Sequence, residues 1–288
     1  MAKSFDAERI VAKKTKKAKE LEPTGIEAID RLPELDPCTI DDYIGAVSAY
    51  VREQRDLGKG PKKAAQIRLS AALGRAFVAD LCKRLPHLKD VVVGERKVAG
   101  GLRTTNADVS QTHELDGLRL AVELKPVNLA VGRAIWNRFG DLRTFAVNIH
   151  LKFPFAVVGG VLVIPTYEEV GTPEAVKADV AEQIAEKAAD STELRQDEAQ
   201  YVAQPEGEVK PSQRSTTHLI VKAVGRLVRA GGRETEADAP HLLEGIAVVA
   251  YDPSTGKMDA GLPETGTGLR WTEFIDDIAR AYEARFEG

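Results

Sequence analysis

The chain has 288 residues, 43% of them hydrophobic and 29% charged, with a formal net charge of -4. These values are typical of globular proteins and exclude a disordered or fibrous chain, and the acidic total excludes a uniformly basic nucleic-acid coat. The charge is uneven, however, because residues 1–160 carry 27 Lys and Arg against 20 Asp and Glu, whereas residues 161–288 carry 13 against 24. The first part of the chain can therefore meet an anionic partner.

Cysteine usage and apolar runs bear on the compartment. Cys38 and Cys82 are not part of a CxxC motif, and the five histidines are scattered, so no zinc pattern is present. Residues 1–20 are rich in lysine and lack an apolar segment, which favours a solvated arm over a signal peptide or a DNA-contacting arm. The longest apolar run, residues 153–165, is too short to span a bilayer. We expect a cytoplasmic protein that does not bind a membrane.

Helices are predicted first along the chain. Residues 1–60 read as an arm followed by a helix, which Thr39 and Asp42 open as an imperfect capping box and which ends at Leu57. A second helix is predicted from Pro61 to about Leu85, where the following proline ends it. Its apolar side chains cover a broad face, as expected for core packing.

The apolar period then changes to that of strands. Residues 61–165 are predicted as one core that starts with this second helix and continues with strands, a further helix and a last buried strand. The expected elements are strands at 89–98, 107–115 and 118–126, a helix at 132–149 and a strand at 155–165.

The remaining chain falls into two parts. Residues 166–212 carry 12 acidic against 4 basic residues and are interpreted as an acidic helical insertion with a loose linker. Residues 213–288 are expected to complete the domain with a helix, a strand and a final amphipathic helix. Together the elements predict an α/β fold with a central mixed sheet, antiparallel at its first hairpin and helix-connected later, flanked by helices.

The hairpin around Asp116-Gly117 concentrates charged side chains. If these two residues form the turn, Asp108 faces Lys125 across the strands and Glu123 lies diagonal to Asp108, about 7–8 Å away at the backbone. All three share a polar face, while the opposite face is largely apolar and includes His113, interpreted as a core residue.

This polar face has two interpretations. Two carboxylates at this spacing can converge on one hard cation such as Mg²⁺, and Lys125 beside them can orient or help deprotonate a water molecule. Alternatively, the face is exposed to solvent and Asp108 and Lys125 form an ordinary cross-strand ion pair. Glu-x-Lys is a frequent tripeptide, so its presence alone does not indicate a metal site. The hairpin alone does not separate the two.

Asp108 followed by Glu123-Leu124-Lys125 resembles the PD-(D/E)xK signature of the restriction-endonuclease-like nucleases. The order helix, three strands, helix, strand over residues 61–165 is also similar to the core of that superfamily. The resemblance implies Mg²⁺-dependent hydrolysis of phosphodiester bonds, with Asp108 and Glu123 binding the metal and Lys125 assisting the attacking water. It covers about a third of the chain.

The chain departs from the family pattern at two places. Ala107 stands where the signature has proline, a change that the superfamily tolerates. Many members also carry an acid on the helix before the first strand, where this chain offers only Asp80. Asp80 is therefore left out of the predicted site.

Basic and polar residues near the hairpin are candidates for DNA binding. A glycine-led loop places Arg103 and Asn106 before the first acid, and such a loop can hold the DNA backbone or merely turn the chain. On the following helix Arg133, Asn137 and Arg138 can contact phosphates or bases, or form a solvated face. Further along the chain, four basic residues recur at helical spacing and suggest a second wall of a DNA cleft: Lys222, Arg226, Arg229 and Arg233. Trp136 is interpreted as a core residue and His150 as a helix cap.

The resemblance favours a Type II restriction endonuclease that cuts double-stranded DNA. Cutting both strands with one site per chain implies a homodimer acting on a palindromic target. No GxxxxGK[ST] motif occurs, so no nucleotide cofactor is expected. Two alternatives stay open: a structure-specific repair or phage nuclease of the same fold, and a non-catalytic α/β binding protein.

Overall fold

The computed structural model describes residues 21–128, 130–170 and 212–287. The chain divides into two compact units, a larger one that runs to Thr166 and resumes at Thr216, and a smaller one from Tyr167 to Ser215. The predicted arm at residues 1–20 and the helical part of the predicted acidic insertion lie outside the described residues.

In the smaller unit, the described residues form a two-stranded antiparallel ribbon. Strand β5 (Tyr167–Val170) pairs with β6 (Ser212–Ser215), and Arg214 forms an ion pair with Glu168 across the two strands. The two ends of the segment predicted as a helical insertion are thus strands.

The larger unit contains the elements that the sequence predicts for the core, with small shifts in their ends. Helix α3 ends one turn earlier than expected because a 3-10 turn follows it, and α4 begins two residues before Pro61. A short helix, α2 (Glu27–Asp30), was not predicted. The helices are α3 (Ile40–Glu53), α4 (Lys59–Arg84), α5 (Val131–His150), α7 (Thr217–Leu227) and α8 (Trp271–Phe286), and the strands are β1 (Val91–Val98), β2 (Thr105–His113), β3 (Gly117–Pro126), β4 (Val157–Pro165), β7 (Gly245–Asp252) and β8 (Lys257–Met258).

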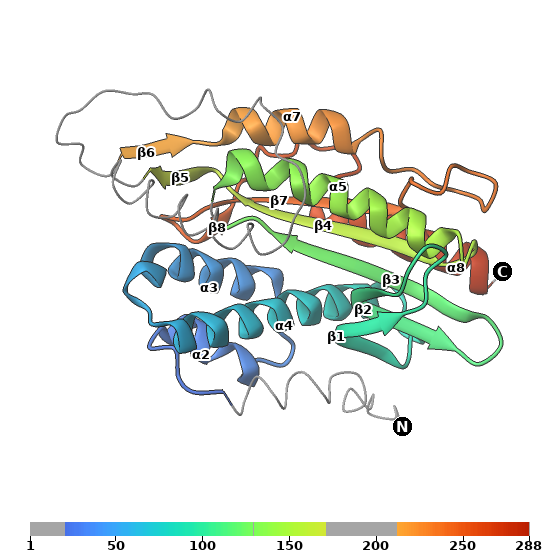
Figure 1. Ribbon diagram of the computed structural model, residues 1–288, viewed down its shortest axis with the longest axis horizontal. Coiled ribbons are helices and arrows are strands. Elements are labelled where there is room, and N and C mark those ends of the chain that lie inside the picture. Colours follow the sequence, from blue (N-terminus) through green and yellow to red (C-terminus); the bar gives the residue numbers. More distant parts are fainter. Residues whose placement is uncertain (1–20, 129, 171–211, 288) are drawn as a thin grey trace. The chain divides into compact units, whose positions relative to one another are not determined.

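One six-stranded sheet runs through the larger unit in the order β1-β2-β3-β4-β7-β8. Strands β1, β2 and β3 are antiparallel neighbours, whereas β3, β4 and β7 run parallel and β8 closes the edge antiparallel to β7 (Figure 1). The predicted α/β fold with a central mixed sheet flanked by helices is confirmed.

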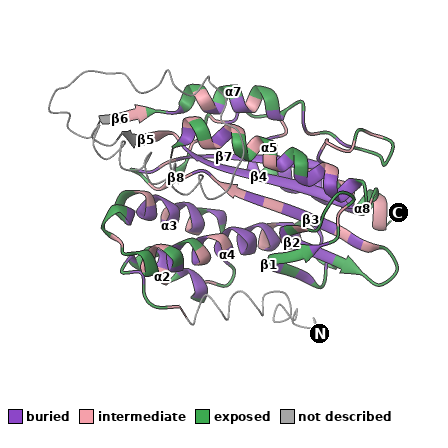
Figure 2. Ribbon diagram, viewed as in Figure 1, coloured by how far each residue is buried: buried purple, intermediate pink, exposed green. Residues whose placement is uncertain are grey.

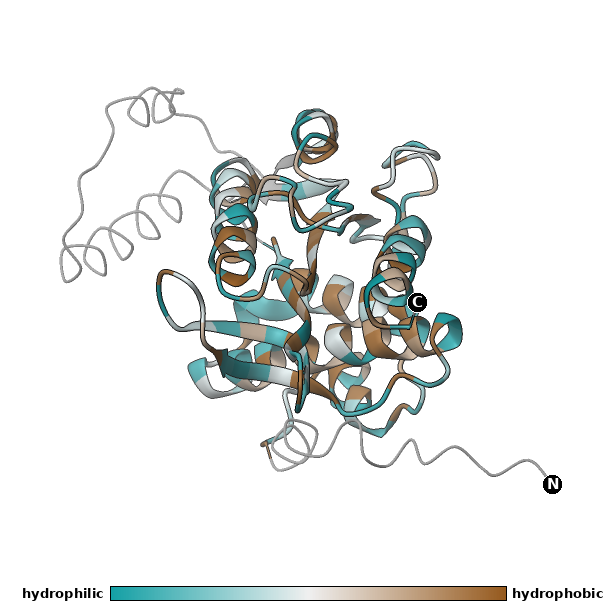
Figure 3. Ribbon diagram, turned by 90° about the vertical axis from the view of Figure 1, so that its right-hand side faces the viewer, coloured by the Kyte–Doolittle hydropathy of each residue, from teal (hydrophilic) through white to brown (hydrophobic). Residues whose placement is uncertain are grey.

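Helices cover both faces of this sheet. In Figure 1, α3 and α4 lie below the strands and α5 and α7 above them, and α8 packs on the same face as α4. All nine residues of β4 are buried, as the purple central strands of Figure 2 indicate. Hydrophobic residues concentrate on these strands and on the helix sides that face them (Figure 3). A strand covered on both faces reads as a continuous apolar run, which is why 155–165 could be recognised.

Two local features place α3 and α4. Thr39 and Asp42 form a complete capping box at the start of α3, so the predicted cap is confirmed. Gly74 lets α4 approach the sheet closely, because a Cβ atom there would lie 2.7 Å from the Cγ1 atom of Val93. Among the described residues, no helix is apolar over a stretch long enough to cross a membrane.

Candidate functional site

The hairpin between β2 and β3 has a longer turn than the sequence analysis predicts. Three residues, Glu114–Asp116, connect the strands, and Gly117 begins β3 with a φ of +73°, which glycine adopts without strain. Asp116 still lies in the turn, where its carboxylate accepts a hydrogen bond of 2.7 Å from Nε of Arg119.

The longer turn and one bulge shift the predicted register by two residues. Val109 pairs with Val122 and Ser110 with Ala121, and an irregularity follows Gln111. Extending this register by one residue sets Asp108 opposite Glu123, instead of opposite Lys125 as predicted. The shift brings the two predicted metal-binding carboxylates nearer to each other.

The site lies where β2 separates from β3. Pairing of these strands ends at Val109–Val122, whereas β3 continues alongside β4 as far as Pro126. Beyond that point Asp108 Oδ2 accepts a hydrogen bond of 2.8 Å from the backbone N–H of Leu124. A carboxylate thus takes the place of a backbone carbonyl in the ladder, which fixes its position between the diverging strands.

Glu123 and Lys125 lie in this opening and form an ion pair with side chains only 12% and 20% exposed. The pKa of Glu123 is raised to about 7, mainly by burial and also by the charge of Asp108, while Lys125 acts in the opposite direction. Two carboxylates and one lysine are therefore close together in a partly buried environment. This environment differs from the freely exposed ion-pair face that was the alternative interpretation of the hairpin.

Helix α5 covers the carboxylates and adds an acid that the sequence analysis did not place in the site. The charge of Asp141 also raises the pKa of Glu123, and Asp141 forms an ion pair of 3.1 Å with Arg138. Beside Glu123 in the sheet lies Gly160, which has no side chain and is approached by Leu142 of α5. The one available signal for Asp141 was its spacing of three from Arg138.

The donor atoms at the site fit a hard divalent cation. Asp108 and Glu123 supply carboxylate oxygens, the ligands that Mg²⁺ prefers, and Mg²⁺ is commonly held by one or two carboxylates together with water and phosphate. Within the described ranges, no three His, Cys, Asp or Glu side chains are grouped so that they could hold a metal ion. A cation here would thus rest on two protein carboxylates.

The predicted DNA-binding loop is anchored to α5 through its backbone. Asn148 Oδ1 accepts hydrogen bonds of 2.9 and 3.0 Å from the N–H groups of Leu102 and Arg103, and Asn148 Nδ2 donates to the Arg103 carbonyl. The side chains of Arg103 and Asn106 are exposed, and neither has a partner among the described residues. The loop is thus fixed while its polar side chains stay accessible.

The predicted DNA-binding residues of α5 are also accessible. Arg133, Asn137 and Arg138 are exposed, and the Arg138 guanidinium is already engaged by Asp141. Arg138 is linked to the carboxylates through Asp141, whose charge raises the pKa of Glu123.

Several residues that the sequence analysis singled out have other roles in the structure. Asp80 accepts a hydrogen bond from the Trp271 indole and pairs with Lys83, which agrees with leaving it out of the site. His113 is exposed beside the turn, so its interpretation as a core residue is wrong. Arg233 and His150 both surround a buried carboxylate, so neither belongs to an exposed stripe or serves as a simple helix cap.

Comparisons with family models, with curated proteins and with solved structures found no match to this chain.

The raised pKa of Glu123 predicts a measurable effect on stability. In the folded protein this carboxyl titrates near 7, against 4.5 for its ordinary value, so the metal-free protein loses stability as pH rises between these values. Glu123→Gln mimics the protonated form and should raise the free energy of unfolding at pH 8 by on the order of 2 kcal/mol.

Denaturant unfolding at pH 4 and pH 8 with a chelator present measures this effect, and the gain should vanish at the lower pH. Glu95→Gln serves as a control because Glu95 is exposed on β1. A gain from Glu123→Gln that is equal at both pH values would contradict the prediction.

Proposed function

We propose that the protein is a Mg²⁺-dependent DNA endonuclease of the PD-(D/E)xK type that hydrolyses phosphodiester bonds in double-stranded DNA. The observation that supports this proposal is the opening between β2 and β3. It sets Asp108 opposite Glu123 and places Lys125 two residues further along β3. An exposed, structural hairpin would not need a carboxylate whose pKa is raised by burial.

Asp108 and Glu123 would hold the metal ion, which when bound supplies charge stabilisation for the phosphate and lowers the pKa of a bound water. Holding a cation also offsets the crowding of the two carboxylates. Two residues of β3 would thus have separate roles, since Glu123 would hold the cation and Lys125 would act on the nucleophile.

Lys125 would act on the attacking water. Its ammonium group donates a hydrogen bond to the water and orients the water's lone pair toward phosphorus. The water oxygen would bond to phosphorus as the bond to the leaving oxygen breaks. The proton of the attacking water would pass to the solvent, and the leaving oxygen would take up a proton from a solvent water. The partial burial of Lys125 and Glu123 strengthens these electrostatic interactions.

Arg103, Asn106, Arg133, Asn137 and Arg138 would contact the DNA around the carboxylates. Sequence-specific cutting by a homodimer at a palindromic site is the form of the activity that we favour. A structure-specific nuclease with the same site is the second candidate.

Digestion of plasmid DNA with Mg²⁺, followed by sequencing of the ends, tests the proposal. We expect discrete fragments whose ends share one short sequence. A smear, or a preference for branched substrates, would favour the second candidate, and intact plasmid in every metal tested would contradict both.

A further inference from the structure

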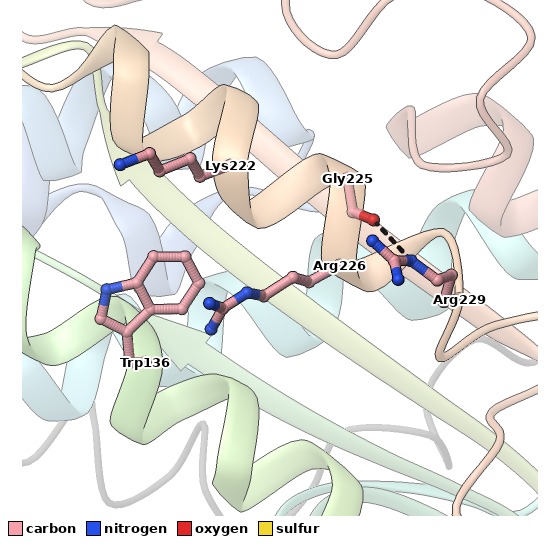
Figure 4. A pocket seen from close by; sticks show the side chains of 5 residues that line it. All are labelled: Trp136, Lys222, Gly225, Arg226 and Arg229. Carbon is pink, nitrogen blue, oxygen red and sulfur yellow. Dashed lines mark hydrogen bonds between the residues drawn. The ribbon is translucent and has the colours of Figure 1, made fainter.

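A basic groove lies between α5 and α7. It has a volume of about 580 Å³ and is lined by Trp136 of α5, by Lys222, Gly225 and Arg226 of α7, and by Arg229 in the turn that follows α7 (Figure 4). The three basic side chains are exposed, while the opposite side of α7 is buried through Ile220, Ala223 and Leu227. The helix is thus fixed by its apolar side and presents its cations to the groove.

Two of the three cations of the groove are held in place by uncharged groups. The Arg226 guanidinium stacks on the Trp136 indole, with 4.3 Å between its central carbon and the ring centroid. Arg229 Nε donates to the Gly225 carbonyl at 3.3 Å. In the part of the chain that the structure describes, no Asp or Glu lies within ion-pair distance of Lys222, Arg226 or Arg229.

This arrangement suits the phosphate groups of a nucleic acid. Stacking on the indole restricts Arg226 and leaves the guanidinium edge to donate hydrogen bonds to phosphate oxygens. Lys222 and Arg226 are four residues apart, which corresponds to about 6 Å along the axis of α7, and Arg229 follows in the turn after the helix. A row of cations at this spacing meets a polyanion whose charges repeat on a similar scale.

The groove and the carboxylates lie on different sides of α5. Trp136 and Arg138 are two residues apart, so they point about 200° apart around the helix. On one side of α5, Arg138 pairs with Asp141, whose charge raises the pKa of Glu123. On another side, Trp136 stacks with Arg226 of α7. The groove is therefore separate from the site proposed for cleavage.

We propose that this groove binds the phosphate backbone of duplex DNA, as a track separated by α5 from the carboxylates. The choice of DNA as the polyanion rests on the proposed function. The groove would add affinity that does not depend on base sequence, because phosphate contacts position a protein on DNA without reading it.

A triple variant, Lys222→Ala with Arg226→Ala and Arg229→Ala, tests this proposal by binding to a short labelled duplex without divalent cations. We expect binding about tenfold or more weaker, and a plot of log affinity against log salt whose slope is reduced by about 2 to 3. A charge-matched control replaces Lys59, Lys63 and Lys257, which are exposed and lie outside the groove. Equal losses in the two triple variants would overturn the proposal, because only net charge would then matter.

Gly225 offers a second test that removes no cation. It is exposed and a Cβ atom there meets nothing within 4 Å, so both Gly225→Glu and Gly225→Ala should fold. The glutamate variant should bind the duplex several-fold more weakly than the alanine variant because it places an acid among the three cations. Equal affinity of the two would overturn the proposal. Cleavage by the wild-type protein is measured separately, so a failure of the nuclease proposal would not be confused with a failure of the groove.

Discussion

Replacing Lys125 by alanine is expected to slow DNA cleavage by roughly 100- to 1,000-fold while binding of DNA is retained. A positioned donor that acts on the nucleophile or on developing charge contributes rate of this order. Lys125 lies beside Glu123 at the opening between β2 and β3, so its loss removes the one basic group that the structure places against the carboxylates within β3. Glu123→Gln and Asp108→Asn should be at least as damaging if these carboxylates hold the metal ion as proposed, because each substitution would then remove a ligand.

Single-turnover cleavage at saturating DNA and Mg²⁺ measures the effect on the chemical step. Lys152→Ala is a matched control, because Lys152 is exposed after the end of α5 and the substitution removes the same charge. Thermal unfolding of each variant checks that the fold is retained. Cleavage by Lys125→Ala at the rate of the control would refute the assignment of the site.

The sequence predicts most elements of the larger unit because their signals are local. Thr39 and Asp42 mark the start of α3 within four residues of chain, and the period of apolar residues identifies α4, α5 and α8. Strand β4 is recognised by its continuous apolar run. In each case the information lies within one element, so no distant contact is needed to read it.

The register of the hairpin could not be read in the same way. Asp116-Gly117 is compatible both with a two-residue turn and with the three-residue turn that the structure adopts, in which only Gly117 has a positive φ. A bulge near Gln111 adds a second displacement that no local signal marks. Because of the longer turn and the bulge, the residue opposite Asp108 is Glu123 and not Lys125.

Contacts between distant residues were also beyond local reading. Asp141 reaches Glu123 because α5 folds back over the sheet, and Gly160 is needed beside it for α5 to approach. The sequence analysis interprets His150 as a helix cap and Arg233 as a member of a basic stripe. Both side chains instead approach the buried carboxylate of Glu244, which lies far from His150 in sequence.

Glu244 is the centre of a buried charge cluster that joins four parts of the larger unit. Its carboxylate forms ion pairs with Arg285 at 2.7 Å and with Arg233 at 3.1 Å, and it lies 3.3 Å from His150. It also accepts a hydrogen bond of 2.7 Å from the backbone N–H of Val158. These groups come from the end of α5, the start of β4, the loop after α7 and the end of α8. The cluster thus holds the far end of α5, the helix that covers the carboxylates.

Glu244→Gln is expected to lower the free energy of unfolding by about 3 to 5 kcal/mol. The substitution keeps the shape of the side chain but leaves two buried guanidinium groups without a counter-charge, and breaking a buried ion pair from one side has costs of this size. Arg233 is 1% and Arg285 9% exposed at the side chain, so water cannot replace the missing charge.

Denaturant unfolding measures this loss, and an exposed ion pair provides the control. Arg84 and Asp276 are 2.7 Å apart but more than half exposed, so Asp276→Asn should cost less than about 1 kcal/mol. A cost for Glu244→Gln no larger than that of Asp276→Asn would show that the buried cluster does not hold the domain together.

The pH dependence of the loss provides a further check. Burial alone would raise the pKa of Glu244, but His150, Arg285 and the Val158 N–H lower it by more, so its pKa in the folded protein lies below 4.5. The stabilisation is therefore fully present above pH 4.5 and is lost as pH falls through the folded pKa. The difference between wild type and Glu244→Gln should shrink as pH falls below about 4.5. This is the reverse of Glu123→Gln, whose gain appears as pH rises, so the two carboxyls can be told apart in one set of unfolding curves.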